Sequence, residues 1–195
     1  MKQFHFARGM WDSAEMPMTY APMCRDRSVV IRQEDDCIAN GFNEKLNDYD
    51  YIGLAMTEPT VGDSTITARC SFEGYGAPLI VLADGVHTDE VGRRRYDAIY
   101  EVVAYENGCN VWRILPVPDP SRPERDFTVI NITRQTFAVA GGSMIDMTIR
   151  VREKRIFVTV NDYSFDVELP DLPSEYYVGV TTCEGLNRFY ELTVE

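Results

Sequence analysis

The stretch MIDMTIRVREKRIFVTVNDYSFD, residues 144–166, decides the fold. Apolar and polar residues alternate over 145–152 and again over 156–160. This period of two is typical of a β-strand with one buried face. Polar two-residue turns at 153–154 and 161–162 separate these runs from each other and from a third run that follows. The stretch therefore predicts three antiparallel strands joined by tight turns.

The rest of the chain repeats this pattern at close spacing. Further strands are predicted at residues 28–33, 37–42, 51–56, 64–73, 78–83, 96–105, 109–115, 127–132, 136–140, 176–182 and 188–194. The polar segment 84–95 is predicted to be a long loop, and Asn107-Gly108 is predicted to form a type I′ turn. Many short strands without an amphipathic helix predict an all-β sandwich of two antiparallel sheets, in one domain over 1–195.

Composition excludes some classes of partner. The formal net charge of the 195-residue chain is −12. A nucleic acid or an anionic membrane surface requires a basic face, so neither is an expected partner. The N-terminus has no apolar core of the signal-peptide type, and no run is long enough for a transmembrane helix. Five cysteines at unrelated spacings form no Cys-x-x-Cys pair, and we interpret them as reduced thiols in a cytoplasmic protein.

Several stretches follow one another in an order typical of paired sandwich strands. They are QEDDCIAN (33–40), DSTITARCSFEGYGAPLIVLADG (63–85), YDAIYEVVAYENGCNVWRI (96–114), MTIRVREKRIFVTVNDYSF (147–165) and YYVGVTTCEGLNRFYELTVE (176–195). From Ser28 to the C-terminus, the chain resembles the concanavalin A-like lectin/glucanase superfamily. One departure is Asp162, which stands where glycine is usual, although aspartate tolerates a left-handed turn conformation.

The resemblance implies a jelly-roll β-sandwich of two curved antiparallel sheets, whose concave face takes up sugar. The superfamily includes lectins, glycosidases, lyases and non-catalytic partners, so the resemblance speaks to fold and leaves the function to analogy.

A mixed polar and aromatic set is predicted on the concave face. Guanidinium and carboxylate groups pair with vicinal hydroxyls, and an aromatic ring stacks on a sugar. The predicted ligand-binding residues are Arg69, Asp97, Glu101, Tyr105 and Arg113. The alternative is a solvated sheet face with cross-strand ion pairs. Trp112 is assigned to the core.

Catalysis has weaker support. The candidate acids and bases are Glu101, Asp97 and His87, and any activity would be of the glycoside hydrolase type. The Cα atoms of Asp97 and Glu101 would lie roughly 13 Å apart along one strand. Paired carboxylates of glycosidases approach to about 5.5 Å or remain within about 10 Å. The Glu-x-Asp-x-(x)-Glu string of the laminarinase-like glucanases does not occur. His87 with Asp89 is an alternative acid/base pair.

Cofactor chemistry has little support. The acids and the imidazole of segment 84–90 indicate calcium only weakly, so no metal site and no cofactor are predicted. The run Arg93-Arg94-Arg95 is interpreted as a flexible exposed triplet, with an anionic ligand such as an acidic sugar as the alternative.

Three functions remain open. The first is non-catalytic binding of a small sugar or oligosaccharide at the concave face. The second is an enzyme that acts on a glycoside through Glu101 and Asp97. The third is a structural or homo-oligomeric interaction subunit that uses a sheet face or a sheet edge.

Overall fold

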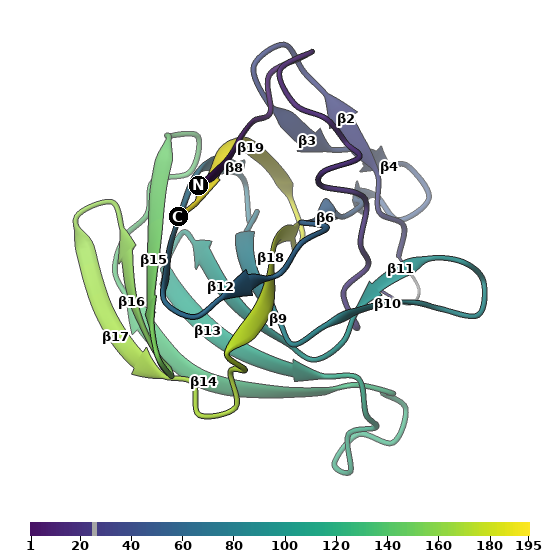
Figure 1. Ribbon diagram of the computed structural model, residues 1–195. Coiled ribbons are helices and arrows are strands. Elements are labelled where there is room, and N and C mark those ends of the chain that lie inside the picture. Colours follow the sequence, from purple (N-terminus) through teal and green to yellow (C-terminus); the bar gives the residue numbers. More distant parts are fainter. Residues whose placement is uncertain (25–26) are drawn as a thin grey trace.

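The computed structural model describes residues 1–24 and 27–195, and in these residues it contains strands and turns. No helix within this part of the chain is long and apolar enough to cross a membrane. Two large antiparallel sheets and two small hairpins make up the fold (Figure 1). The two chain ends lie side by side, because β1 near the N-terminus pairs with the last strand, β19.

The eight-stranded sheet contains the stretch that predicted the fold. Its order is β17-β16-β15-β8-β19-β3-β2, with β1 also paired to β19. The strands are β1 (Lys2–His5), β2 (Ile31–Gln33), β3 (Ile38–Asn40), β8 (Ser64–Glu73), β15 (Ile145–Arg152), β16 (Arg155–Val160), β17 (Tyr163–Glu168) and β19 (Leu186–Val194). The predicted meander of three strands is therefore confirmed as β15, β16 and β17.

The seven-stranded sheet carries the hairpin that the ligand-site prediction depends on. Its order is β14-β13-β12-β9-β18-β6, with β7 also paired to β18. The strands are β6 (Gly53–Ala55), β7 (Thr60–Val61), β9 (Pro78–Ala83), β12 (Ile99–Tyr105), β13 (Gly108–Leu115), β14 (Thr128–Thr136) and β18 (Glu175–Thr182). A small separate hairpin pairs β4 (Phe42–Asn43) with β5 (Asp48–Tyr49).

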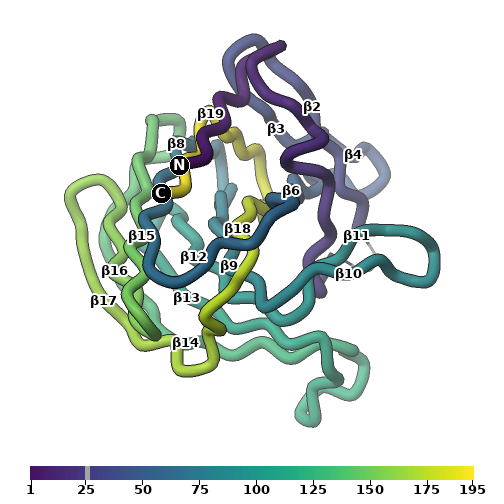
Figure 2. The backbone as a smooth tube through the Cα atoms, viewed as in Figure 1, coloured from purple at the N-terminus to yellow at the C-terminus, as the bar shows by residue number. Residues whose placement is uncertain are grey.

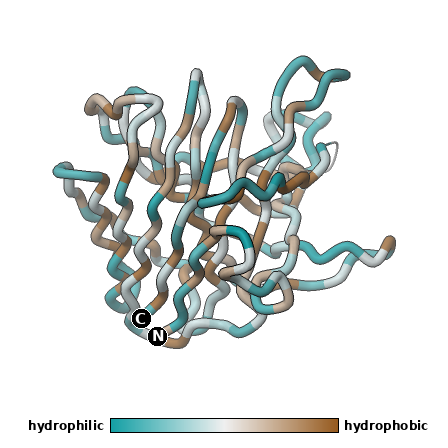
Figure 3. Tube along the Cα trace, turned by 90° about the horizontal axis from the view of Figure 1, so that it is seen from above, coloured by the Kyte–Doolittle hydropathy of each residue, from teal (hydrophilic) through white to brown (hydrophobic). Residues whose placement is uncertain are grey.

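The main core lies between the two sheets. Along β15 the buried residues alternate with exposed or half-buried ones, as the sequence pattern predicts. Figure 3 shows the same alternation of hydrophobic and hydrophilic residues along many of the strands. The core residues that the two sheets contribute include Ile66, Cys70 and Phe72 from β8, Ile145, Met147 and Ile149 from β15, and Tyr100, Val102 and Ala104 from β12. This arrangement confirms the predicted sandwich.

The turn between β12 and β13 differs from the prediction. Tyr105 pairs with Gly108, so Glu106 and Asn107 are the central residues of the turn, and neither takes a positive φ. The predicted type I′ turn at Asn107-Gly108 is therefore wrong. Glycine is needed at 108 for another reason, because φ is 145° there and a Cβ would lie 1.9 Å from the carbonyl oxygen of Gln135 on β14.

The segment predicted as one long loop, 84–95, is largely a hairpin. β10 (Val86–Thr88) pairs with β11 (Arg94–Tyr96) and the pair projects from the body of the molecule (Figure 1). Asp89 starts the turn by accepting a hydrogen bond from the backbone N–H of Val91, and Gly92 supplies the positive φ of 80° that closes it. The spacing Asp-x-x-Gly is the sequence signal for this turn.

Candidate functional site

The outer face of the seven-stranded sheet, meaning the face turned away from the eight-stranded sheet, is the candidate functional surface. On an antiparallel pair, residues directly opposite each other share a face. Val81, Glu101 and Trp112 are paired across β9, β12 and β13, and Tyr100 on the opposite face belongs to the core between the sheets. The outer face therefore carries the alternating residues of β12 that the sequence assigned to it, including Glu101 and Tyr105.

The centre of this face is covered by the N-terminal segment 17–24, which we call the cover segment. In Figures 1 and 2 this part of the chain passes beside β6 toward β11. The backbone N–H of Tyr20 donates to the carbonyl oxygen of Arg94 at 3.0 Å, and the N–H of Tyr96 donates back to Tyr20 at 3.0 Å. A second hydrophobic cluster lies beneath it, in which Ala21 and Cys24 pack with Tyr51, Ala55, Val81, Ala83, Tyr96, Ile99 and Ile114.

Tyr96 closes the face on the β18 side. Its hydroxyl donates to the carbonyl oxygen of Leu54 at 2.6 Å. A Cβ at Gly179 of β18 would lie 1.8 Å from this hydroxyl, so only glycine leaves room for the ring above the strand. The middle of the outer face is thus filled by apolar and aromatic side chains and is not an open groove.

Glu101 is buried at the centre of this covered region. Its side chain is 2% exposed, and its Oε1 atom has no hydrogen-bond partner among the described residues. Burial alone raises the pKa of the Glu101 carboxyl to about 8, so the group is predominantly protonated at neutral pH. The pKa of Cys24 is raised by burial and then by the charge that Glu101 would carry, and the pKa of Cys183 is raised by burial, by Glu184 and then by Glu101.

The five predicted ligand residues do not share one face, so this part of the prediction is corrected. Arg69 lies on β8 of the other sheet and pairs with Asp146 at 2.9 Å. Arg113 lies opposite Tyr100, with its guanidinium carbon 4.3 Å from the centre of that ring, and it forms a two-point ion pair with Asp84. Whether any of these residues binds a ligand stays a prediction.

Trp112 also lies on a different face from the one predicted. It is opposite Glu101 on β12 and Asn131 on β14, so it belongs to the outer face and not to the core between the sheets. The core assignment followed from placing Arg113 on the exposed face, since Trp112 alternates with it along the strand. The pairing parity of a hairpin with a two-residue turn is the signal that would have given the outer face, because it brings even residues of β13 opposite odd residues of β12.

A partly open region remains beyond the cover segment, on strands β12 to β14. We call it the aromatic patch, and it consists of Tyr105, Asn110, Trp112, Asn131 and Arg134. The register places Asn110 opposite Arg134 and Trp112 opposite Asn131. Tyr105 and Trp112 are half-buried, Asn131 and Arg134 are exposed, and the Tyr105 hydroxyl donates to Oδ1 of Asn110 at 3.4 Å. The amide of Asn131 and the guanidinium of Arg134 are thus exposed near a partly buried indole, whereas Asn110 is buried.

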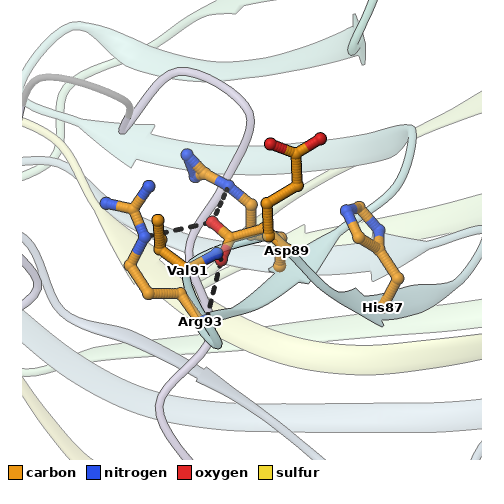
Figure 4. A pocket seen from close by; sticks show the side chains of 6 residues that line it. His87, Asp89, Val91 and Arg93 are labelled. Carbon is orange, nitrogen blue, oxygen red and sulfur yellow. Dashed lines mark hydrogen bonds and ion pairs between the residues drawn. The ribbon is translucent and has the colours of Figure 1, made fainter.

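The third candidate region is a surface pocket of about 340 Å³ on the β10–β11 hairpin (Figure 4), lined by His87, Asp89, Glu90, Val91, Arg93 and Arg95. His87 is bonded to Asp97 and not to Asp89, with 2.6 Å between Nδ1 and Oδ1. Both side chains are about half exposed. The Asp97 side chain is therefore engaged with the hairpin.

The arginine run is more ordered than the sequence indicated. Arg93 and Arg95 both pair with Asp89, at 3.0 and 3.1 Å. Arg94 donates to the carbonyl oxygens of Ala55 and Met56, each at 2.7 Å. The interpretation as a flexible exposed triplet is thus wrong, since each guanidinium has fixed partners. Within the described ranges, no group of three or more histidine, cysteine, aspartate or glutamate side chains is arranged to hold a metal ion.

Comparison with known proteins gives the fold. No protein-family model and no curated protein matches the sequence. Among solved structures, the carbohydrate-binding module CBM66 from Bacillus subtilis matches with a TM-score of 0.60 and 11% identity, over 86% of this chain and 92% of that one. The fold is a concanavalin A-like jelly roll.

Two further matches have different roles. The κ-carrageenase from Pseudoalteromonas carrageenovora, solved with a κ-carrageenan oligosaccharide, matches with a TM-score of 0.61 and 6% identity, over 98% of this chain and 92% of that one. The exoplasmic/lumenal domain of VIP36, solved with Ca²⁺ and mannose units, matches with a TM-score of 0.56 and 12% identity, over 98% and 85%. At such identities the likeness shows the fold alone, and the neighbours include both binding proteins and an enzyme that act on carbohydrate.

Proposed function

We propose that this protein binds carbohydrate without transforming it, and that the aromatic patch is its sugar site. The observation that carries the proposal is the partly exposed side chain of Trp112 on the outer face, in register with Asn131 and next to the Asn110–Arg134 pair. A sugar ring stacks on an indole face, while amide and guanidinium groups bond its hydroxyls. The carbohydrate-binding fold neighbours support this class of ligand.

Calorimetric titration with a panel of neutral oligosaccharides tests the proposal. Trp112→Ala should weaken binding by about tenfold or more, since an aromatic stack contributes on the order of 1 kcal/mol beyond its buried area. Trp112→Phe should retain part of the affinity. Phe157→Ala, which removes an exposed ring from the other sheet, is the matched control. If the Trp112→Ala and Phe157→Ala proteins bind the oligosaccharide with equal affinity, the aromatic patch is not the sugar site.

A glycoside-acting enzyme is the second candidate, and Glu101 is the observation that favours it. A carboxyl group with a pKa of about 8 carries the proton that a general acid donates at neutral pH. Against this role, Glu101 is buried beneath the cover segment, and Asp97 is bonded to His87. Glu101→Gln should abolish any glycoside turnover if the carboxyl is the acid, and unchanged turnover would exclude it.

Assembly and location stay proposals. Homo-oligomerisation would use a sheet edge such as β14, which has β13 as its strand partner in the seven-stranded sheet. Light scattering on the purified protein checks this, and a strict monomer would contradict it. A cytoplasmic location follows from the sequence interpretation alone.

A further inference from the structure

The pocket on the β10–β11 hairpin combines hydrogen-bond donors whose orientation is fixed by carboxylates. His87 and Arg95 are opposite each other in the hairpin, so their side chains share one face. Arg93 lies two residues before Arg95 and its side chain lines the same pocket. Figure 4 shows Asp89 joined to Arg93 by dashed lines, and Asp89 also pairs with Arg95. Atoms of these side chains that are not used in contacts within the hairpin are available to a ligand.

Asp89 is occupied entirely within the hairpin. Its Oδ1 accepts hydrogen bonds from the backbone N–H groups of Val91 and Arg93, at 3.1 and 2.8 Å. Its Oδ2 accepts from Nε of Arg93 at 3.0 Å and pairs with Nε of Arg95 at 3.1 Å. Both guanidinium groups therefore meet Asp89 through Nε, which leaves their Nη nitrogens outside these contacts.

Tyr20 of the cover segment fixes the same two arginines from another side. The guanidinium carbons of Arg93 and Arg95 lie 5.5 and 5.8 Å from the centre of its ring. The Nη1 atom of Arg95 is buried without a hydrogen-bond partner among the described residues. Because that nitrogen is shielded, the acceptor oxygens of a ligand would meet Arg93 first, whose side chain is 41% exposed against 12% for Arg95.

His87 adds a ring nitrogen, Nε2, at the other end of the pocket, which accepts a hydrogen bond from a hydroxyl when Nδ1 carries the proton. Its Nδ1 is bound to Asp97, so the ring is held in place and Nε2 remains outside that contact. Glu90, which also lines the pocket, adds a carboxylate that accepts hydrogen bonds from hydroxyl groups. Guanidinium forks suit an oxyanion, and a carboxylate suits the hydroxyls attached beside it.

We propose that this pocket binds an acidic sugar, with the sugar's carboxylate or sulfate at the exposed guanidinium of Arg93, beside Arg95, and its hydroxyls at Glu90. This inference rests on the proposed carbohydrate binding, but it concerns a site on the hairpin that is separate from the aromatic patch. It adds a ligand class, because the patch offers one guanidinium and the pocket offers two.

NMR titration of the ¹⁵N-labelled protein tests the inference with three probes: glucose, glucuronate and glucose 6-sulfate. The acidic sugars should shift the amide signals of residues 87–95, and glucose should not. Arg93→Gln should weaken glucuronate binding by about tenfold or more, because a charge-assisted pair is lost. The backbone bond from Arg93 to Asp89 remains in this variant, so the turn is retained. The affinity of the Arg93→Lys protein for glucuronate should lie between those of the parent and the Arg93→Gln protein, since lysine keeps the charge but lacks the forked guanidinium.

Arg150→Gln is the control, because Arg150 is exposed on β15 of the other sheet. Equal shifts by glucose and glucuronate, or equal affinity of the Arg93→Gln and Arg150→Gln proteins, would overturn the inference. Acetate or inorganic sulfate binding as tightly as the acidic sugars would overturn its sugar component. If neutral oligosaccharides bind at the aromatic patch but acidic sugars do not shift the signals of residues 87–95, this inference alone is overturned. If no sugar of either kind binds, the proposed function is overturned as well.

Discussion

Glu101 is an ionisable residue in a buried, largely apolar environment. A carboxyl group is rarely fully buried without a partner, because removing its charge from water is costly. In this protein the carboxyl lies opposite Val81 and Trp112, and burial is the cause of its raised pKa. The group consequently stays protonated in the folded state over a pH range in which it ionises in the unfolded chain.

Stability should therefore fall as pH rises between about 4.5 and 8, the ordinary and the folded pKa of Glu101. In this window the unfolded state binds fewer protons than the folded state, so the free energy of unfolding decreases by up to about 1.4 kcal/mol per pH unit from this group. Glu101→Gln removes the titration and keeps the shape. The stability difference between variant and parent should thus grow with pH, as measured by urea unfolding. Parallel pH profiles for the two proteins would contradict the buried carboxyl.

The sequence located part of the site at the residue scale. Alternation along one strand correctly placed Glu101 and Tyr105 on the outer face. It failed across strands. Arg69 has the polar neighbours expected of a groove residue, but its strand belongs to the other sheet. Which strands become neighbours depends on contacts distant in sequence, and alternation within a strand carries no information about them.

The cover segment is the element that most changes the candidate site. Its anchor is Arg94, whose guanidinium donates to Oγ1 of Thr19 at 3.0 Å and to the carbonyl oxygens of Ala55 and Met56. Burial lowers the pKa of Arg94, which shows how far this cation is drawn into the protein. One side chain thus links the cover segment, the edge strand β6 and the hairpin.

Arg94→Ala should loosen the cover segment. Loss of these charge-assisted hydrogen bonds should speed amide hydrogen exchange of residues 17–24 by about tenfold or more, while β8 in the core keeps its protection. Hydrogen exchange followed by mass spectrometry measures both segments in one experiment. Arg150→Ala on the exposed side of β15 serves as the control. Unchanged exchange at 17–24 would show that apolar packing alone holds the segment.

The hairpin β10–β11 was missed at the element scale because most of its residues are polar, and only Val86 and Tyr96 at its base pack against the second hydrophobic cluster. A strand that packs on a core alternates apolar and polar residues, and this hairpin projects from the body and has no such requirement. Its turn chemistry, Asp89 to Gly92, was readable from the sequence. The polar composition of residues 84–95 nevertheless favoured the prediction of a loop over that of a hairpin.

At the scale of the whole molecule, the fold encloses the cysteines. Cys24, Cys37, Cys70 and Cys109 are buried, and Cys183 is intermediate. Burial raises the pKa of Cys24 and of Cys109 to about 12, so at pH 8 the reactive thiolate is roughly one part in ten thousand. All five are free thiols in the structure.

Thiol titration with Ellman's reagent should then depend on folding. The native protein should react slowly and first at Cys183, and the urea-unfolded protein should release five equivalents at once. Cys183→Ser should remove the first native phase. A rapid native reaction of several thiols would show that the sandwich opens more readily than its packing indicates.

The sequence by itself determined most of the strands, their alternation and the sandwich class, because the period of side-chain burial is a local property of an extended chain. It also determined that residues 144–166 form a meander, since two-residue turns pair neighbouring strands. Tertiary structure alone decided that the N-terminal segment covers the outer face, that Glu101 is buried beneath it, and that Trp112 remains partly open at its edge. These features depend on segments far apart in the chain meeting in space, and their contacts leave no local period in the sequence.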